Sequence, residues 1–384
     1  MKWETVSVGE VTNHLKGFAF KSSHYVQHGV PVVRVSDFTE DSISMQEVKY
    51  YPMSLRDNYV KYMLETGDIL IQTVGSWQNN PLSVVGKVVT VPEELNGALL
   101  NQNIVKLFPA EKIDGRFLFY RLKCSDFFGH NIGNATGAAN QASITLNTIN
   151  SFKFDIPKFP TQRCIAKILS AYDDLIENNQ RQINLLEEAA MLLYKEWFVK
   201  LRFPGHENVK VVDGVPEGWS KGSLQELIDV KYGKDHKKLL NGDMPVYGSG
   251  GIMRRVNKSL YAGESVLIPR KGSLNNIMFI NEEFWTVDTM FYSIPKRAFI
   301  MPYVYLYLKG WDMYAMNTGA AVPSTTTETL NSMQISIPSE YLLAKFDKAA
   351  QNYFSCANAL KRQINQARAA RDKLLPKLMN GEII

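Results

Sequence analysis

The chain has 384 residues, of which 45% are hydrophobic and 21% are charged, and this length suits two domains better than one core. It has no run of about 18 apolar residues, which excludes a membrane-spanning helix. Its first ten residues, MKWETVSVGE, lack the apolar core of a signal peptide, so we expect a cytoplasmic protein. The net charge is +5, but residues 1–157 carry 14 basic and 15 acidic side chains, and residues 207–338 carry 14 and 13. This balance disfavours a protein that coats DNA regardless of sequence.

Two copies of one plan follow each other along the chain. The tetrapeptide Arg-Gln-Ile-Asn occurs at residues 181–184 and again at 362–365, an offset of 181. Further matches occur in the same order in both copies, and chance does not produce such an ordered series. The matched pairs are Trp3 and Trp219, Glu10 and Glu226, Gly17 and Gly233, Gly67 and Gly263, Gly137 and Gly319, Pro157 and Pro338, and Tyr172 and Tyr353. The sequence therefore predicts a tandem repeat with pseudo-two-fold symmetry.

The first part of each copy, residues 1–157 and 207–338, is rich in short β-type runs separated by Gly, Asn and Pro. Examples are DILIQTV and VVGKVVTV in the first copy, and SVLIPR and IMFINEEFWTV in the second. Such runs indicate strands, and each part ends in a strand-like segment that closes on Ile-Pro. We therefore predict two mixed, strand-rich domains in a chain of the α+β class.

A long helix is predicted after each strand-rich part, within residues 158–206 and 339–384. An apolar stripe that repeats every seven residues needs a partner helix to cover it. We expect the two helices to form an antiparallel coiled coil that spaces the domains, about 60 Å long at 1.5 Å per residue. The alternative is that each helix packs only on its own domain. Asn179 interrupts the first stripe, where it either fixes the register or lies at a solvated edge. The stripe residues are Ile165, Leu169, Tyr172, Ile176, Ile183, Leu186, Ala190, Leu193 and Trp197, and Phe346, Ala350, Tyr353, Ala357, Leu360, Ile364, Ala367 and Leu374.

Motifs of catalysis and metal binding are missing from the sequence. Gly233-Lys234-Asp235 lacks the upstream glycine and the hydroxyl of a phosphate-binding loop. Residues 79–82 (NNPL) lack the aromatic residue that stacks a flipped base in an amino-methyltransferase. His24 and His28 have the spacing of a zinc site without its glutamate. The cysteines are odd in number and far apart, so we expect reduced core thiols at Cys124, Cys164 and Cys356.

Ordered segments of both copies carry a resemblance to a known family. In the first copy they are Trp3, residues 29–37 (GVPVVRVSD), residues 67–70 (GDIL), and Gly137, Gln141 and Ile144 ahead of Ile156-Pro157 and Gln162. In the second copy they are Trp219, residues 244–252 (MPVYGSGGI) and Gly263-Glu264. Over nearly its whole length, the chain resembles the specificity (S) subunits of type I restriction-modification systems. It departs from the family pattern where Pro323 replaces the glutamine of the first copy and Leu343 replaces Gln162.

This resemblance implies a non-catalytic subunit that recognises double-stranded DNA. Each strand-rich domain is then a target-recognition domain that reads half of a bipartite target. The helices dock two methyltransferase subunits, and restriction-translocation subunits complete the complex. No cofactor is expected in this chain, whereas S-adenosylmethionine, ATP and Mg²⁺ are expected in the partner subunits. The competing interpretation is a DNA-independent coiled-coil scaffold with two domains that bind proteins or other ligands.

Four regions are candidate DNA contacts because they combine donors with turn-forming residues. Arginine suits guanine edges, Gln and Asn suit adenine, and clustered cations beside glycines favour phosphate. In the first copy the alternatives are an Arg34–Asp37 surface pair and a plain turn at residues 75–80. The candidates there are Lys16, Lys21, Arg34, Ser36 and Asp37, and the loop residues Ser76, Trp77, Gln78 and Asn79. In the second copy they are Lys234, Lys237, Lys238, Tyr247, Ser249, Arg254 and Arg255, and the aligned loop residues Arg270, Lys271 and Ser273.

A separate group of large apolar residues clusters near the helix ends. Aromatic and methionine side chains suit partner docking, so this group is the candidate docking surface for other subunits. The alternative is that these residues cap the coiled coil or form the floor of a domain. They are Tyr194, Trp197 and Phe198 on the first helix, and Leu374, Leu378 and Met379 on the second.

Overall fold

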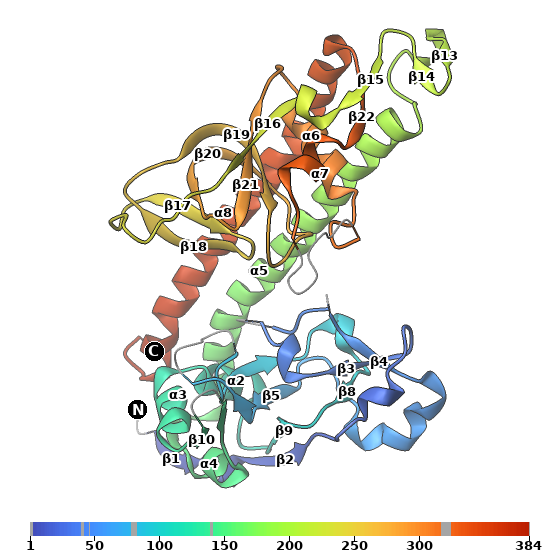
Figure 1. The fold of residues 1–384 in the computed structure, drawn as a ribbon. Coiled ribbons are helices and arrows are strands. Elements are labelled where there is room, and N and C mark those ends of the chain that lie inside the picture. The colour runs from blue at the N-terminus through green and yellow to red at the C-terminus, as the bar shows by residue number, and fades with distance from the viewer. Residues whose placement is uncertain are drawn as a thin grey trace. The chain divides into compact units, whose positions relative to one another are not determined.

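The computed structural model describes residues 3–39, 42–45, 47–77, 83–138, 141–315 and 324–383. The chain divides into two compact units, the first formed by residues 1–177 with 365–384 and the second by residues 178–364. Each unit contains a strand-rich domain and segments of two long helices, α5 (Phe159–Tyr194) and α8 (Glu340–Met379) (Figure 1). Among the described helices, none is long and apolar enough to cross a membrane. The predicted α+β class is confirmed.

The first unit is built on a four-stranded antiparallel sheet of order β2-β9-β5-β7. Their bounds are Thr12–Lys16, Ile104–Pro109, Ile69–Gln72 and Val88–Thr90. The other strands form smaller sheets: β1 (Glu4–Ser7) with β12 (Lys153–Ile156), β4 (Lys49–Tyr51) with β3 (Val30–Val33) and β8 (Leu99–Leu100), and β10 (Thr136–Ala138) with β11 (Gln141–Ser143) and β6 (Val74–Gly75). Side chains alternate between the two faces of a strand. Accordingly Ile69 and Ile71 of β5 enter one core and Leu70 enters another.

Short helices cover this sheet: α1 (Val8–Val11), α2 (Gly115–Leu122), α3 (Ser125–Gly133) and α4 (Leu146–Ser151). Helix α2 begins at Asp114, whose carboxylate accepts a hydrogen bond from the Phe117 backbone at 2.9 Å. The buried Gln162 side chain of α5 accepts from the Asp114 backbone at 2.8 Å and donates to the Pro157 carbonyl at 2.9 Å. Gln162 therefore connects the start of α2 to the start of α5.

The second unit holds a six-stranded sheet of order β16-β21-β19-β20-β17-β18. Their bounds are Ile228–Tyr232, Met290–Pro295, Tyr261–Pro269, Met278–Thr286, Met244–Gly248 and Gly251–Val256. The remaining elements are β13 (Val211–Val212) with β14 (Val215–Pro216), β15 (Ser220–Ser223) with β22 (Gln334–Ile337), α6 (Met301–Lys309) and α7 (Thr327–Asn331). The alternation of β5 recurs in β19, because Val266 and Ile268 enter one core and Leu267 enters another.

The two units repeat one architecture, so the predicted duplication is visible in the structure. Strand β1 pairs antiparallel with β12, as β15 does with β22. The middle strands β9 and β21 both lie between two antiparallel neighbours. A β-carbon at Gly17 would lie 1.9 Å from the Asn101 carbonyl oxygen, and one at Gly233 would lie 2.0 Å from that of Val287. Both units therefore require glycine at this crossing of backbone segments.

The predicted heptad stripes are buried or half-buried on both long helices. In the second unit, Asn179 donates to Gln363 at 3.2 Å while Trp197 packs on Phe346 with ring centroids 5.7 Å apart. From Asn179 to Trp197 the contacts move backward along α8, from Gln363 to Phe346, so the two helices run antiparallel, as predicted. Asn179 is buried in this pair rather than lying at a solvated edge. A π-helical turn, Lys195–Val199, extends α5.

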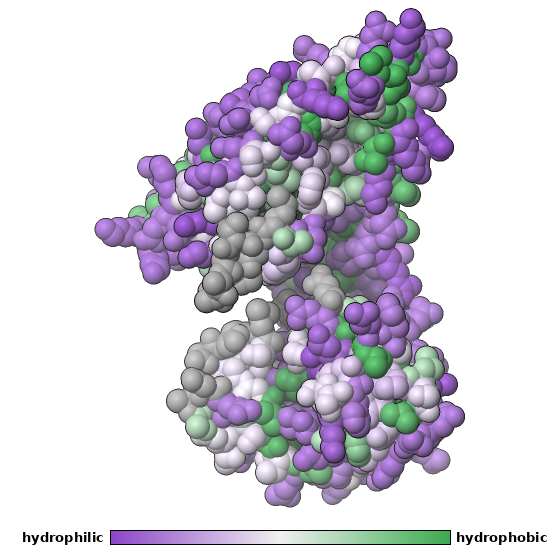
Figure 2. All heavy atoms as spheres, turned by 45° about the vertical axis from the view of Figure 1, so that its right-hand side comes forward, coloured by the Kyte–Doolittle hydropathy of each residue, from purple (hydrophilic) through white to green (hydrophobic). Residues whose placement is uncertain are grey.

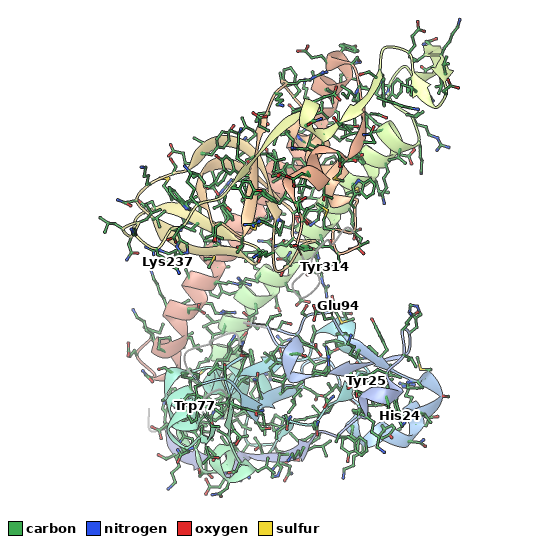
Figure 3. All side chains as sticks on the ribbon, viewed as in Figure 1. His24, Tyr25, Trp77, Glu94, Lys237 and Tyr314 are labelled. Atoms are coloured by element: carbon green, nitrogen blue, oxygen red, sulfur yellow. The ribbon has the colours of Figure 1, made fainter. Side chains whose placement is uncertain are left out.

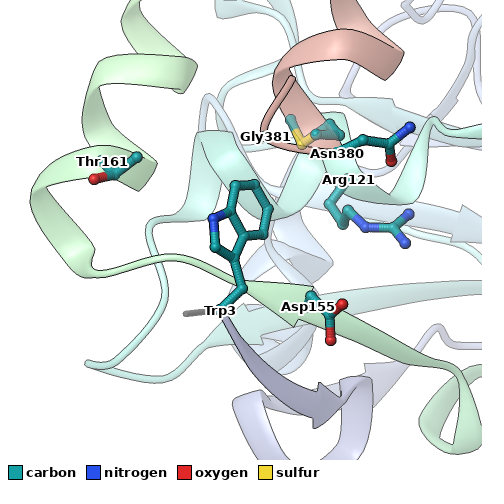
Figure 4. Close-up of a pocket in the computed structure, with 7 residues that line it drawn as sticks. Trp3, Arg121, Asp155, Thr161, Asn380 and Gly381 are labelled. Carbon is teal, nitrogen blue, oxygen red and sulfur yellow. The ribbon is translucent and has the colours of Figure 1, made fainter. Parts of the chain in front are cut away.

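The described ends of the chain lie together in the first unit. A β-carbon at Gly381 would lie 3.1 Å from the Trp3 ring. The two residues line a pocket of about 390 Å³ with Arg121, Asp155 and Thr161 (Figure 4). The Arg121 guanidinium is not free in this pocket, because it forms a bidentate ion pair with Asp126. One sequence expectation is wrong here: all three cysteines are free, but Cys164 and Cys356 are exposed instead of in the core, since they lie on the outer faces of their helices.

Candidate nucleic-acid interface

A loop after β5 presents the first group of candidates. Strand β6 pairs with β11, so that Gly75 lies opposite Ala142. The Ser76 hydroxyl hydrogen-bonds to Ser83 at 2.9 Å, and the Trp77 indole donates to the Ala138 carbonyl at 2.9 Å. These two bonds anchor Ser76 and Trp77 to the neighbouring segments. Gln78 and Asn79 lie outside the described residues.

The equivalent loop of the second unit follows β19 and contains Arg270, Lys271 and Ser273. The backbone of Lys271 forms an isolated antiparallel β-bridge with Ser324. Gly272 has a φ of +87°, a backbone conformation that favours glycine. A β-carbon at Gly272 would lie 2.6 Å from the Ser249 hydroxyl. The Asn276 amide donates to the Ser249 carbonyl at 2.8 Å. The structure therefore brings together Ser249 and this loop, which are about twenty residues apart in the sequence.

The cations of the second unit divide into anchored and unanchored groups. Arg254 donates to the Leu239 carbonyl and to Asn241, both at 3.0 Å, and Arg255 donates to the Asp243 carbonyl at 2.5 Å. These two arginines tie the loop before β17 to the neighbouring strand β18. Lys234, Lys237 and Lys238 are exposed, and within the described ranges their ammonium groups make no hydrogen bond or ion pair. Asp235 lies beside Lys237, whose backbone N–H and charge both lower the pKa of the Asp235 carboxyl. They remain available to an anionic ligand.

Arg34 lies at the centre of a local ion pair. Its guanidinium donates to both carboxylate oxygens of Asp37, at 2.7 and 3.2 Å, and to the Glu47 carbonyl at 2.7 Å. The Asp37 side chain is 2% exposed, whereas that of Arg34 is 23% exposed. The pair considered as the alternative from the sequence is thus present, and Asp37 holds Arg34 in place. Ser36 is exposed beside it, so DNA contact by this group stays a prediction.

Two further candidates, Lys16 and Lys21, are exposed on either side of an aromatic core. Phe18 and Phe20 pack edge-to-face at 5.1 Å and against Tyr59 at 5.0 and 5.1 Å. These rings therefore belong to a small aromatic core of the first unit. Figure 3 places His24, whose backbone N–H donates to the Lys21 carbonyl, and Trp77 at opposite ends of the first unit, so Lys21 and the loop at Trp77 do not form one cluster.

Tyr247 does not face solvent. Its side chain is buried, and its hydroxyl donates to Glu282 at 2.6 Å. Burial raises the pKa of this hydroxyl, and the hydrogen bond to Glu282 raises the pKa further. Tyr247 therefore positions the strand that leads to Ser249.

The proposed partner-docking residues also lie mainly inside their own units. Tyr194 and Phe198 are buried against Tyr303 and Phe346 in the second unit. Leu378 and Met379 are buried in the core of the first unit, with Leu374 packed against it. This arrangement matches the alternative in which these side chains cap the helix pair, because the domain supplies the apolar surface that covers them. Only Trp197 and Leu374 of the six are half-exposed.

Sequence reasoning missed three residues beside the loop after β19. The Tyr314 hydroxyl donates to the Gly272 carbonyl at 3.1 Å, and Tyr314 is 45% exposed. Tyr232 is 51% exposed, with the Arg270 guanidinium 5.4 Å from its ring centre. Asn276 carries the bond to Ser249. In Figure 3, Tyr314 and Lys237 lie on the same lower edge of the second unit. The adjacent asparagines Asn275 and Asn276 could have indicated a polar loop from the sequence, whereas nothing in the sequence distinguishes Tyr232 and Tyr314 from other tyrosines.

The visible face of the molecule is mostly hydrophilic, with hydrophobic residues scattered among the polar ones (Figure 2). Within the described residues, no group of three or more His, Cys, Asp or Glu side chains is placed to hold a metal ion.

Comparison with known proteins agrees with this arrangement. The family model described as the type I restriction modification DNA specificity domain matches residues 1–188 and again residues 216–366. The chain belongs to this family. The double match also coincides with the two structural copies. As a type I specificity subunit, the chain is the non-catalytic component that provides DNA sequence specificity.

Relatives and a solved structure cover most of the chain. The type I restriction enzyme MjaIX specificity subunit of Methanocaldococcus jannaschii is 23% identical over 75% of this chain and 73% of its own length. The HindI specificity subunit of Haemophilus influenzae is 21% identical over 99% of both chains. The crystal structure of a type I S subunit from M. genitalium has a TM-score of 0.57 at 17% identity, covering 99% of this chain and 96% of that one. This structure supports the shared fold.

Proposed function

We propose that this specificity subunit reads a bipartite, asymmetric DNA target, with one half-site for each strand-rich domain. The observation that carries the proposal is the equivalent loop after β5 and β19, which has the same place in both units but different side chains. In the first unit it presents Ser76 and Trp77, and in the second unit Arg270, Lys271 and Ser273. Because different donors suit different bases, two such loops favour two different half-sites.

The contacts of the second unit divide into two classes in this proposal. Arg270, Ser273 and Asn276 lie on the loop that meets Ser249, where a planar guanidinium or an amide can read a base edge. Lys234, Lys237 and Lys238 are exposed point charges that make no hydrogen bond or ion pair through their ammonium groups in the described ranges, and such charges suit phosphates. The first class should set sequence preference, and the second should set overall affinity and its salt dependence.

The complex in which the subunit acts is part of the same proposal. Two methyltransferase subunits that use S-adenosylmethionine and restriction subunits that use ATP and Mg²⁺ supply the chemistry, in the cytoplasm. Family membership supports such partners. The exposed outer face of α5, where Leu185 and Leu192 are 64% and 60% exposed, is a better candidate for docking than the buried residues at the helix ends.

Methylation mapping of cells with and without this chain tests the bipartite target. We expect a motif of two specified half-sites separated by an unspecified spacer, and a single uninterrupted motif would contradict the proposal. Purified subunit should also be retained on mixed duplex DNA with a steep dependence on salt. A scaffold that does not bind DNA would show neither result.

Variants of the second unit separate the two contact classes. Arg270→Ala should relax one half-site, with a loss of about 1–3 kcal/mol on the preferred sequence. Lys237→Ala with Lys238→Ala should weaken binding to all sequences alike and lower the salt slope by about one to two. Lys221→Ala, on the exposed face of β15, is the matched control and should change neither. If Arg270→Ala weakens all sequences equally, then Arg270 is a phosphate contact.

A further inference from the structure

The two long helices carry opposite net charges. Helix α5 has three basic and five acidic residues, a net charge of −2, whereas α8 has eight basic and three acidic residues, a net charge of +5. The two helices are the two copies of one duplicated segment and carry the same seven-residue apolar stripe. Each helix could therefore also pair antiparallel with the same helix of a second copy of the chain. Which pairing forms depends on contacts that differ between the two helices.

A polar cluster in the first unit is such a contact. The Tyr120 hydroxyl of α2 donates to Asp173 of α5 at 2.5 Å, and Arg371 of α8 donates to the other oxygen of Asp173 at 2.6 Å. The Arg371 side chain is 7% exposed and that of Asp173 is 30% exposed. Asp372, which is largely exposed, accepts a second bond from Arg371 at 3.0 Å. The Asp173–Arg371 pair therefore joins α5 to α8 at a largely shielded position.

The equivalent layer of the second unit is apolar. The offset of 181 places Phe354 where Asp173 stands and Ala190 where Arg371 stands. The match between Leu122-Lys123 and Leu308-Lys309 places Leu306 where Tyr120 stands. Leu306, Phe354 and Ala190 are all buried in one core. The same position in the helix pair is thus charged in one unit and hydrophobic in the other.

We propose that Asp173 and Arg371 select the pairing of α5 with α8 of the same chain, against the pairing of either helix with its counterpart in a second copy. In a pair of two α5 helices, Asp173 would face Ala190. In a pair of two α8 helices, Arg371 would face Phe354 and would lose its shortest ion pair, the one with Asp173. Each self-pairing leaves a shielded charge without its main partner, which is strongly unfavourable.

A second ion pair acts in the same direction. Glu187 and Lys361 lie 3.5 Å apart in the second unit. The residue of α8 equivalent to Glu187 is Arg368, so a pair of two α8 helices would place Lys361 against Arg368. Like charges at flanking positions of a helix pair oppose association. The net charge of +5 on each α8 adds to this repulsion.

The selection has a consequence for DNA recognition, which rests on the proposed bipartite reading. A dimer with exchanged helices would join two first domains on one helix pair and two second domains on the other. Each pair would then present identical recognition domains and a symmetric target. By excluding this exchange, Asp173 and Arg371 act as positioning residues that keep the target asymmetric.

The test transplants the apolar layer of the second unit into the first, in the full chain, as Tyr120→Leu, Asp173→Phe and Arg371→Ala. Differently tagged chains are unfolded and refolded together, because exchange requires the helices to separate, and the products are measured by sedimentation velocity and pull-down. We expect the unmodified chain to refold without exchange and the triple variant to shift toward a dimer that contains both tags. A triple variant that folds and shows no exchange, or an unmodified chain that exchanges freely, would overturn the proposal.

Two controls keep the test decisive. Asn179→Leu also removes a buried polar contact of the helix pair, but self-paired α5 would offer Gln182 to Asn179 in place of Gln363. This variant should therefore not exchange. If the triple variant fails to fold, Asp173→Asn with Arg371→Gln removes both charges but keeps polar side chains of similar size in the layer. This double variant should exchange more than the unmodified chain, and unchanged exchange would also refute the proposal. Sedimentation does not depend on DNA, so a failure here is distinct from a failure of the bipartite target.

Discussion

Replacing Arg34 with alanine tests whether this residue serves the fold, the DNA or both. The variant leaves the Asp37 carboxylate, 2% exposed, without its cationic partner. The Arg34 backbone N–H and the Ser36 hydroxyl still donate to that carboxylate, at 2.8 and 3.2 Å. Breaking a buried ion pair on one side costs about 3–5 kcal/mol. Because the Arg34 side chain is 23% exposed, we expect a loss of about 2–4 kcal/mol from the free energy of unfolding of the first unit.

This loss should lower the melting temperature of the first unit by roughly 5–15 °C, since about 1 kcal/mol shifts a domain of this size by about 2–4 °C. Thermal unfolding is measured beside DNA binding. Arg270→Ala is the matched control, because the structure pairs its guanidinium with the Asp288 carbonyl at 3.3 Å and the Tyr232 ring, and it should lose less than about 1 kcal/mol. Adding Asp37→Asn to Arg34→Ala removes the unpaired charge and should recover part of the loss. An Arg34→Ala variant of unchanged melting temperature that no longer binds DNA would refute the structural role.

Three further predictions concern other parts of the chain. Gln162→Leu should destabilise the first unit by about 1–3 kcal/mol in urea unfolding, because the Asp114 N–H loses its acceptor. Leu343→Gln, at the equivalent position, should destabilise the second unit by a similar amount. An unchanged free energy of unfolding in Gln162→Leu would contradict this role of Gln162. Burial raises the pKa of Glu264 above its ordinary value of 4.5, so this group contributes stability to the second unit that grows as the pH falls through the window just above pH 4.5, whereas carboxyls of lowered pKa such as Asp229 contribute in the opposite direction. The free energy of unfolding of Glu264→Gln, subtracted from that of the unmodified chain, should therefore show a difference that grows as the pH falls, and a difference independent of pH would exclude this contribution. A circular permutant can be opened within the exposed link 205–212, with the ends near Trp3 and Gly381 joined by about ten flexible residues. Methylation mapping should show that this permutant keeps both half-sites. Loss of one half-site would refute the equivalence of this link and the chain ends.

The helices and the duplication could be predicted from the sequence because their signals are local or repeated. A stripe every seven residues, as from Ile165 to Trp197, allows few alternatives to a paired helix. The ordered matches from Trp3 and Trp219 onward require no knowledge of folding. The structure confirms both, and the register contacts Asn179–Gln363 and Asp173–Arg371 specify how the helices meet.

The roles of single side chains could not be predicted in the same way, because burial depends on segments far away in the sequence. Phe18 and Phe20 lie between the candidate lysines Lys16 and Lys21 in the sequence, yet Tyr51 and Tyr59 enclose Phe20 in the fold. Phe198 resembles a docking residue, yet Tyr303, more than 100 positions later, covers it.

The charged candidates show the same division between sequence and tertiary structure. Residue type already marked Arg34, Arg254 and Lys237 as cations able to meet DNA. Only the fold decided that Arg34 is held by Asp37, that Arg254 anchors a loop, and that Lys237 remains exposed. The physical reason is that a guanidinium donates hydrogen bonds to the acceptors that the folded backbone brings within about 3 Å of it. The sequence alone does not specify those distances.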